Sequence, residues 1–152
     1  MSRRYLVSQI LLVDGILLIF VAFIHLFATP LIGKWLAREL TPEALKNISP
    51  PFLLDHIVVG ILLMPFGIST LYSAAGVRAG QSWARNIAIV NALVVLLMPL
   101  LLVVFIGPSY FSAMPFLVAA IIMTCVAISM ILPLLWLRKP RQLDKYPLAE
   151  DD

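Results

Sequence analysis

Four long apolar runs limit this chain to very few folds. They cover about residues 5–29, 52–75, 83–106 and 114–137. A helix needs roughly 20 mostly apolar residues to cross the hydrocarbon core of a bilayer. A segment inside the bilayer must satisfy its own backbone hydrogen bonds, which favours helices, and the runs lack the alternation of a membrane barrel. The sequence therefore predicts an all-α integral membrane protein, a bundle of four transmembrane helices.

The composition of the chain is typical of a protein in lipid rather than in an aqueous environment. Hydrophobic residues make up 62% of the 152 residues and charged residues only 12%, whereas soluble domains carry about 25% charged residues. The net charge of +3 is small, so no nucleic-acid partner is expected. The single cysteine, Cys125, excludes an intrachain disulfide and any C-x-x-C or zinc pattern. We expect one transmembrane domain over 1–152.

The basic residues are divided unequally between the two sides of this predicted bundle. Three lie in the connection between the first two runs, namely Lys34, Arg38 and Lys46. The other eight fall on the opposite side, namely Arg3, Arg4, Arg78, Arg85, Arg138, Lys139, Arg141 and Lys145. Cytoplasmic loops are enriched in lysine and arginine. A multi-pass protein with cytoplasmic N- and C-termini is therefore predicted, with 138–152 as a cytoplasmic tail whose basic residues contact membrane lipids.

Residues 30–51 form the only long connection. Its first part places apolar side chains on one helical face, namely Ile32, Trp35, Leu36 and Leu40, which is typical of a short helix in the interface plane. Thr41, Pro42 and Glu43 then have the residue types of an N-cap and first helical turn. We expect a short interfacial helical excursion between the first two spans, ended by Pro50 and Pro51.

Four ionisable side chains lie within the spans, and each is a functional candidate because its burial in lipid is costly. They are Asp14, His25, Asp55 and His56. From a rise of 1.5 Å per residue, the last three lie roughly 6–8 Å below the outer ends of their helices. This shared depth predicts an outer-leaflet polar pocket formed by His25, Asp55 and His56.

A second, deeper polar pair is predicted from Asp14 and Asn91. Both lie roughly 12–13 Å from the inner ends of their helices, so a hydrogen bond between them would join the first and third spans. Small residues should let helices approach closely, at Gly60, Gly67 and Ala74 and at Ala84, Ala88 and Ala92. Asp14 and Asn91 complete the predicted ligand-binding set of His25, Asp55 and His56.

Several functions are compatible with these residues. His25 and His56 could supply both axial ligands of a haem b, or bind a metal ion together with Asp55. Kinked helices around an acid–base pair would also suit a binding protein or isomerase for a sterol-like or quinone-like molecule. The favoured hypothesis is a non-catalytic accessory or assembly subunit, associated with partner membrane subunits or with itself, in which the polar groups anchor the helices.

The prolines within three of the spans, Pro65, Pro99 and Pro133, predict kinks in these helices. In this outline the chain resembles the sterol-isomerase and sigma-2 receptor group and the small four-helix subunits of the DoxX type. The resemblance is one of architecture, with no motif matched residue by residue, so it implies a four-helix fold and assigns no site residue.

Overall fold

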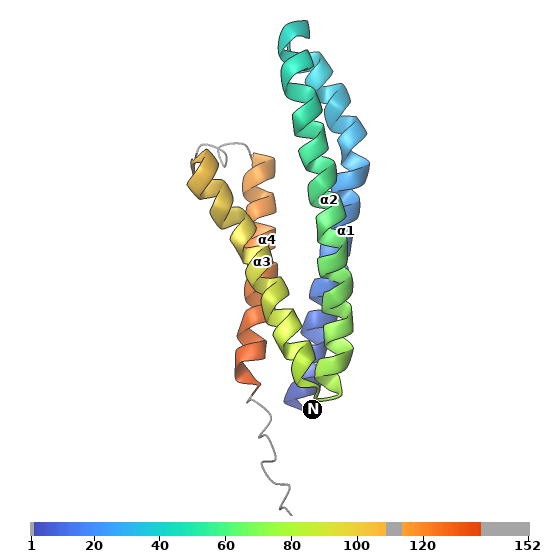
Figure 1. Ribbon diagram of the computed structural model, residues 1–152, viewed down its shortest axis with the longest axis vertical. Coiled ribbons are helices and arrows are strands. Elements are labelled where there is room, and N and C mark those ends of the chain that lie inside the picture. Colours follow the sequence, from blue (N-terminus) through green and yellow to red (C-terminus); the bar gives the residue numbers. More distant parts are fainter. Residues whose placement is uncertain (1, 109–113, 138–152) are drawn as a thin grey trace, which may run out of the picture.

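The computed structural model describes residues 2–108 and 114–137. The chain forms four helices there, which Figure 1 shows as one elongated bundle: α1 (Arg3–Glu39), α2 (Pro42–Arg78), α3 (Ser82–Ile106) and α4 (Met114–Trp136). All four are long and apolar enough to cross a membrane. The predicted all-α bundle of four spans is confirmed. The predicted cytoplasmic tail, 138–152, lies outside the described residues.

The connection between the first two spans differs from the expected excursion. α1 and α2 are continuous helices of 37 residues each, with Pro30 inside α1 and both Pro50 and Pro51 inside α2. The prediction that Pro50 and Pro51 end the excursion was wrong, because a proline removes one backbone donor and can bend a helix without stopping it. The predicted helix start is confirmed, since Thr41 Oγ1 accepts a 3.3 Å hydrogen bond from the Ala44 amide.

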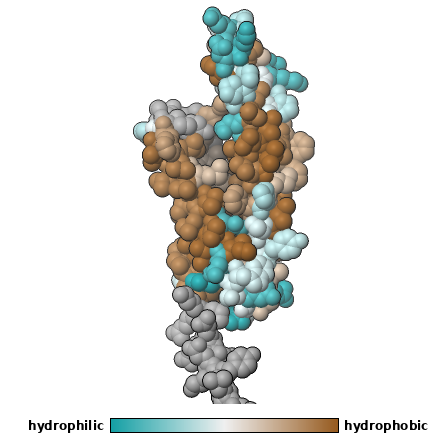
Figure 2. All heavy atoms as spheres, viewed as in Figure 1, coloured by the Kyte–Doolittle hydropathy of each residue, from teal (hydrophilic) through white to brown (hydrophobic). Residues whose placement is uncertain are grey.

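The two long helices make a hairpin that projects past the rest of the bundle. At 1.5 Å per residue each is about 55 Å long, against a bilayer core of about 30 Å. Figure 1 shows α1 and α2 extending beyond the neighbouring ends of α3 and α4. The tip of the projection is hydrophilic (Figure 2), and its charged residues are Lys34, Arg38, Glu39, Glu43 and Lys46. Residues 30–53 are called the projecting hairpin below.

Glycines allow α1 and α2 to pack closely along their length. A Cβ on Gly67 would lie 2.9 Å from the Gly15 carbonyl oxygen and 3.0 Å from the Ile19 amide nitrogen. A Cβ on Gly60 would lie 3.1 Å from the Ala22 carbonyl oxygen. These distances are too short for a larger side chain unless the backbones separate. The predicted small-residue contact on the second span is therefore present, and its partner is α1.

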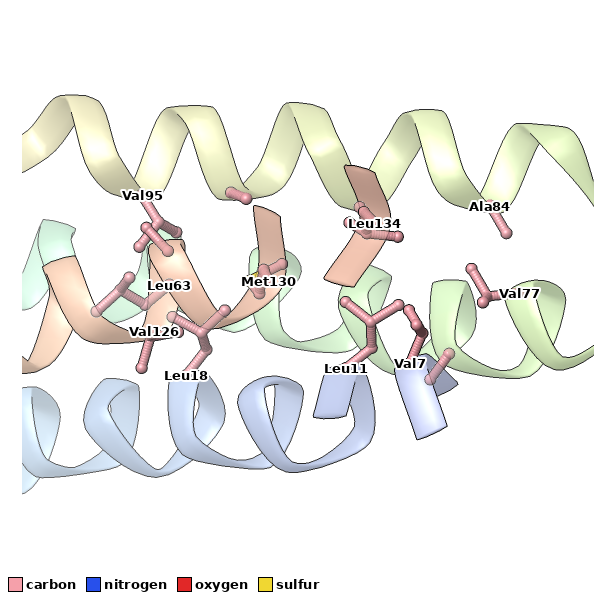
Figure 3. Packing of buried hydrophobic residues seen from close by; sticks show 14 of the residues in the cluster. Val7, Leu11, Leu18, Leu63, Val77, Ala84, Val95, Val126, Met130 and Leu134 are labelled. Atoms are coloured by element: carbon pink, nitrogen blue, oxygen red, sulfur yellow. The ribbon is translucent and has the colours of Figure 1, made fainter. Parts of the chain in front are cut away.

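The shared core of the four helices fills only the half of the bundle near the N-terminus. In Figure 3 buried side chains from all four helices point toward one another, among them Leu11, Leu63, Val95 and Met130. On α3 no described side chain after Val95 is buried, and on α4 none before Val126. The α3–α4 pair thus shares a core with α1–α2 at one end only. This end holds Arg3, Arg4, Arg78 and Arg85 and is called the basic end.

Candidate functional site

Asp14 lies in the shared core and contacts α4. Its side chain is 4% exposed, and its Oδ1 accepts a 2.8 Å hydrogen bond from the Ser129 hydroxyl. The same hydroxyl lies 2.8 Å from the Val126 carbonyl oxygen of its own helix. Asp14 Oδ2 is buried and has no hydrogen-bond partner among the described residues. Asp14 and Ser129 therefore form a polar link between α1 and α4.

Asn91 makes a separate polar link, between α3 and α2. Its Nδ2 donates to Ser69 Oγ at 2.6 Å and to Thr70 Oγ1 at 3.2 Å. Both hydroxyls in turn donate to the Phe66 carbonyl oxygen, at 3.2 Å and 2.7 Å. The predicted hydrogen bond between Asp14 and Asn91 was wrong, because each side chain is bonded to serine or threonine hydroxyls of another helix.

His25 and His56 come together on the α1–α2 hairpin. Their ring centroids are 4.5 Å apart, with 37° between the ring planes. His25 Nδ1 lies 3.0 Å from the Val21 carbonyl oxygen; because that carbonyl can only accept, the proton of this bond is on Nδ1. Phe52 stacks on His56 at a centroid distance of 6.4 Å. The histidines thus form a ring contact between two adjacent helices, as their shared depth predicted.

Asp55 does not complete a metal site with these two rings. Its side chain is exposed, and the described residues contain no group of three or more His, Cys, Asp or Glu side chains able to hold a metal ion. The predicted three-ligand site of His25, His56 and Asp55 is therefore not formed. Two imidazoles alone leave a divalent ion such as zinc short of its usual ligand number.

The paired histidines also do not fit a haem. Axial ligands approach the iron from opposite faces of the macrocycle, so the two rings must be separated by it. With their centroids 4.5 Å apart the rings contact each other directly. No porphyrin can lie between His25 and His56 in this arrangement.

The five predicted ligand-binding residues fall into separate groups. Along α1, Asp14 lies eleven residues from His25, which is about 16 Å of helix. Asn91 and Asp14 belong to different hydrogen-bonded links in the core, and Asp55 is exposed. The structure therefore brings His25 and His56 together, leaves Asp55 exposed beside His56, and keeps Asp14 and Asn91 apart from them. A ligand-binding role for these residues stays a prediction.

The hydroxyl residues that complete the polar links were not predicted from the sequence. Ser129, Ser69 and Thr70 are common in membrane helices and carry no charge, so nothing marked them beside the ionisable groups. Their positions could have indicated them, because each lies on the same helix face as buried residues of its span. Ser73 is a further case: it is fully buried, and its Oγ has no partner among the described residues.

No family model, curated protein or solved structure matches this chain. Four apolar helices long enough to cross a bilayer, joined in the core by polar links, define its class as a four-helix multi-pass membrane protein.

Proposed function

We propose that this protein is a non-catalytic subunit of a membrane complex and that it binds a partner membrane protein through the projecting hairpin. The observation that carries this proposal is an apolar stripe on α1, formed by Leu31 and Trp35 of the hairpin and by Phe27 just before it. These side chains are 74%, 66% and 57% exposed. Spacings of four residues place them on one face of the helix.

The position of this stripe distinguishes it from an ordinary lipid-facing surface. Trp35 lies next to Lys34 and one turn from Arg38, so the stripe reaches the level at which charged side chains leave the bilayer core. α3 and α4 do not cover it there, because they end before the hairpin does (Figure 1). Exposed apolar patches with a polar rim are typical of interaction sites, and tryptophan and arginine dominate binding energy in such sites.

The polar side chains of the bundle support a structural rather than a catalytic role. Asp14 with Ser129, and Asn91 with Ser69 and Thr70, connect helices to one another. The His25 and His56 rings are occupied by their mutual contact. Inter-helix contacts of this kind explain the presence of polar groups at membrane depth without a reaction.

The orientation that goes with this proposal places both termini in the cytoplasm. Arg3, Arg4, Arg78 and Arg85 gather at the basic end, and positive residues favour the cytoplasmic side. The projecting hairpin then lies on the opposite side of the membrane, where the partner would meet it. Labelling of Ser49→Cys by an impermeant maleimide in intact cells, in a Cys125→Ala background, tests this orientation; labelling only after permeabilisation would contradict it.

Purification in mild detergent tests the proposed subunit role. The full-length protein should co-purify with another integral membrane chain at fixed stoichiometry. The double variant Leu31→Ala/Trp35→Ala should reduce its recovery about tenfold or more, because a central tryptophan contributes at least about 2 kcal/mol to many interfaces. The matched control Leu97→Ala/Leu100→Ala changes exposed side chains of α3 and should keep the partner. Recovery as a monomer alone, or equal loss in both double variants, would contradict the proposal.

A further inference from the structure

A groove lies between α1 and α4 at the basic end, far from the projecting hairpin. It has a volume of about 540 Å³, within the range of pockets that hold small ligands. Leu6, Val7 and Ile10 of α1 and Pro133 and Trp136 of α4 line it together with Arg3. Leu6 and Trp136 are 49% and 70% exposed, so the groove is open at the surface of the bundle.

Among the described residues, Arg3 is the one charged side chain that lines this groove. The other arginines at the basic end have contacts elsewhere: Arg78 lies over the Tyr5 ring, 5.2 Å from its centroid, and Arg85 Nε donates a 3.1 Å hydrogen bond to the Leu134 carbonyl oxygen. Arg3 has no carboxylate partner within 2–108 and 114–137, the part of the chain that the structure describes. The nearest acid along α1 is Asp14, about 16 Å away, and it is bonded to Ser129.

We propose that this groove binds one anionic phospholipid of the leaflet at the basic end, with the Arg3 guanidinium on its phosphate. The apolar side chains below Arg3 provide the surface for an acyl chain, since Leu6 and Ile10 follow at intervals of three and four residues on one face of α1. Trp136 lies at the end of α4 and fits the interfacial position that tryptophan prefers in membrane proteins. A cationic side chain above an apolar groove matches an anionic lipid in both charge and polarity.

Quenching of Trp136 fluorescence by brominated lipids tests this site in the full-length protein. Trp35→Phe/Trp83→Phe leaves Trp136 as the only tryptophan. In phosphatidylcholine vesicles, brominated phosphatidylglycerol should quench Trp136 more strongly than the same fraction of brominated phosphatidylcholine. Arg3→Gln should lower the relative affinity for phosphatidylglycerol about fivefold, the factor expected for one basic residue near an anionic surface. Arg3→Lys should preserve most of the relative affinity for phosphatidylglycerol.

Two control variants separate this site from general surface charge. Arg38→Gln removes a basic residue from the other end of α1 and should leave the lipid preference unchanged. The second control neutralises the basic residues that follow α4, in the variant Arg138→Gln/Lys139→Gln/Arg141→Gln/Lys145→Gln. In this background Arg3→Gln should still lower the relative affinity for phosphatidylglycerol. Equal quenching by the two lipids would overturn the proposal. So would a preference that survives Arg3→Gln and disappears in the four-residue variant.

Discussion

Ser129 on α4 donates a 2.8 Å hydrogen bond to Oδ1 of Asp14 on α1, joining two residues that are 115 positions apart in the chain. A second polar link, the contact of Asn91 with Ser69 and Thr70, joins α3 to α2. Both links lie in the half of the bundle that has a shared core. Outside this half, α1 and α2 continue as a pair without α3 and α4.

Loss of the Ser129 hydroxyl should destabilise the bundle. Ser129→Ala leaves Asp14 without its partner, and we expect a loss of about 1 kcal/mol in the free energy of unfolding, the usual scale of hydrogen bonds between membrane helices. Thr124→Ala is the matched control, because the Thr124 hydroxyl donates within its own helix, to Ala120 at 2.8 Å. Unfolding in mixtures of detergent and dodecyl sulfate measures both. Equal stability of the two variants would contradict a link between α1 and α4.

The hydrogen bonds of Asn91 should stabilise the packing of α3 against α2. Asn91→Ala removes donors to Ser69 and Thr70 and opens space in the core, so we expect a loss of about 1–3 kcal/mol in the free energy of unfolding. Ser69→Ala removes only one acceptor and should cost less. The same unfolding titration measures both variants. A larger loss for Ser69→Ala than for Asn91→Ala would show that Asn91 is not the centre of this link.

Gly67 sets the distance between α1 and α2. In Gly67→Ala the new methyl group would meet the backbones of Gly15 and Ile19 at 2.9 Å and 3.0 Å, so the helices must separate at a cost of about 1–3 kcal/mol. In Gly33→Ala it would meet only the end of the Leu53 side chain, at 3.3 Å, and alanine favours the helix by up to about 1 kcal/mol. The melting temperature of Gly67→Ala should therefore be below that of the wild-type protein. The melting temperature of Gly33→Ala should equal or exceed that of the wild type. The reverse order would contradict the packing of α1 on α2.

The histidine pair should behave as a ring contact and not as a metal or haem site. His25→Phe/His56→Phe keeps two rings in contact, so we expect the melting temperature to change little, whereas the double alanine variant loses the contact and should melt lower. A chelator should leave the melting temperature of the wild-type protein unchanged. A reducible Soret band in the purified protein, or a chelator-induced drop in its stability, would show that the rings separate to bind a ligand.

The four spans were predictable from the sequence because length and hydropathy dominate folding in a bilayer. The close approach of His25 and His56 was predictable from their equal depths on neighbouring antiparallel helices. The partner of Asp14 was not, because depth does not determine which helix faces a buried carboxylate, and the serine that bonds it carries no charge. The continuity of α1 and α2 was also missed. Pro50 and Pro51 suggested the end of a separate excursion, but contacts such as Gly33 with Leu53 continue between the helices in this region.

Photo-crosslinking from position 35 decides whether the projecting hairpin binds a partner membrane protein. We would replace Trp35 by p-benzoylphenylalanine in the full-length protein and irradiate intact membranes, with Leu100 of α3 replaced in the same way as the control. The proposal predicts one adduct of defined mass with another membrane protein from position 35 and none from position 100. The same adducts from both positions, an adduct with a second copy of this chain alone, or no adduct from position 35 would contradict it.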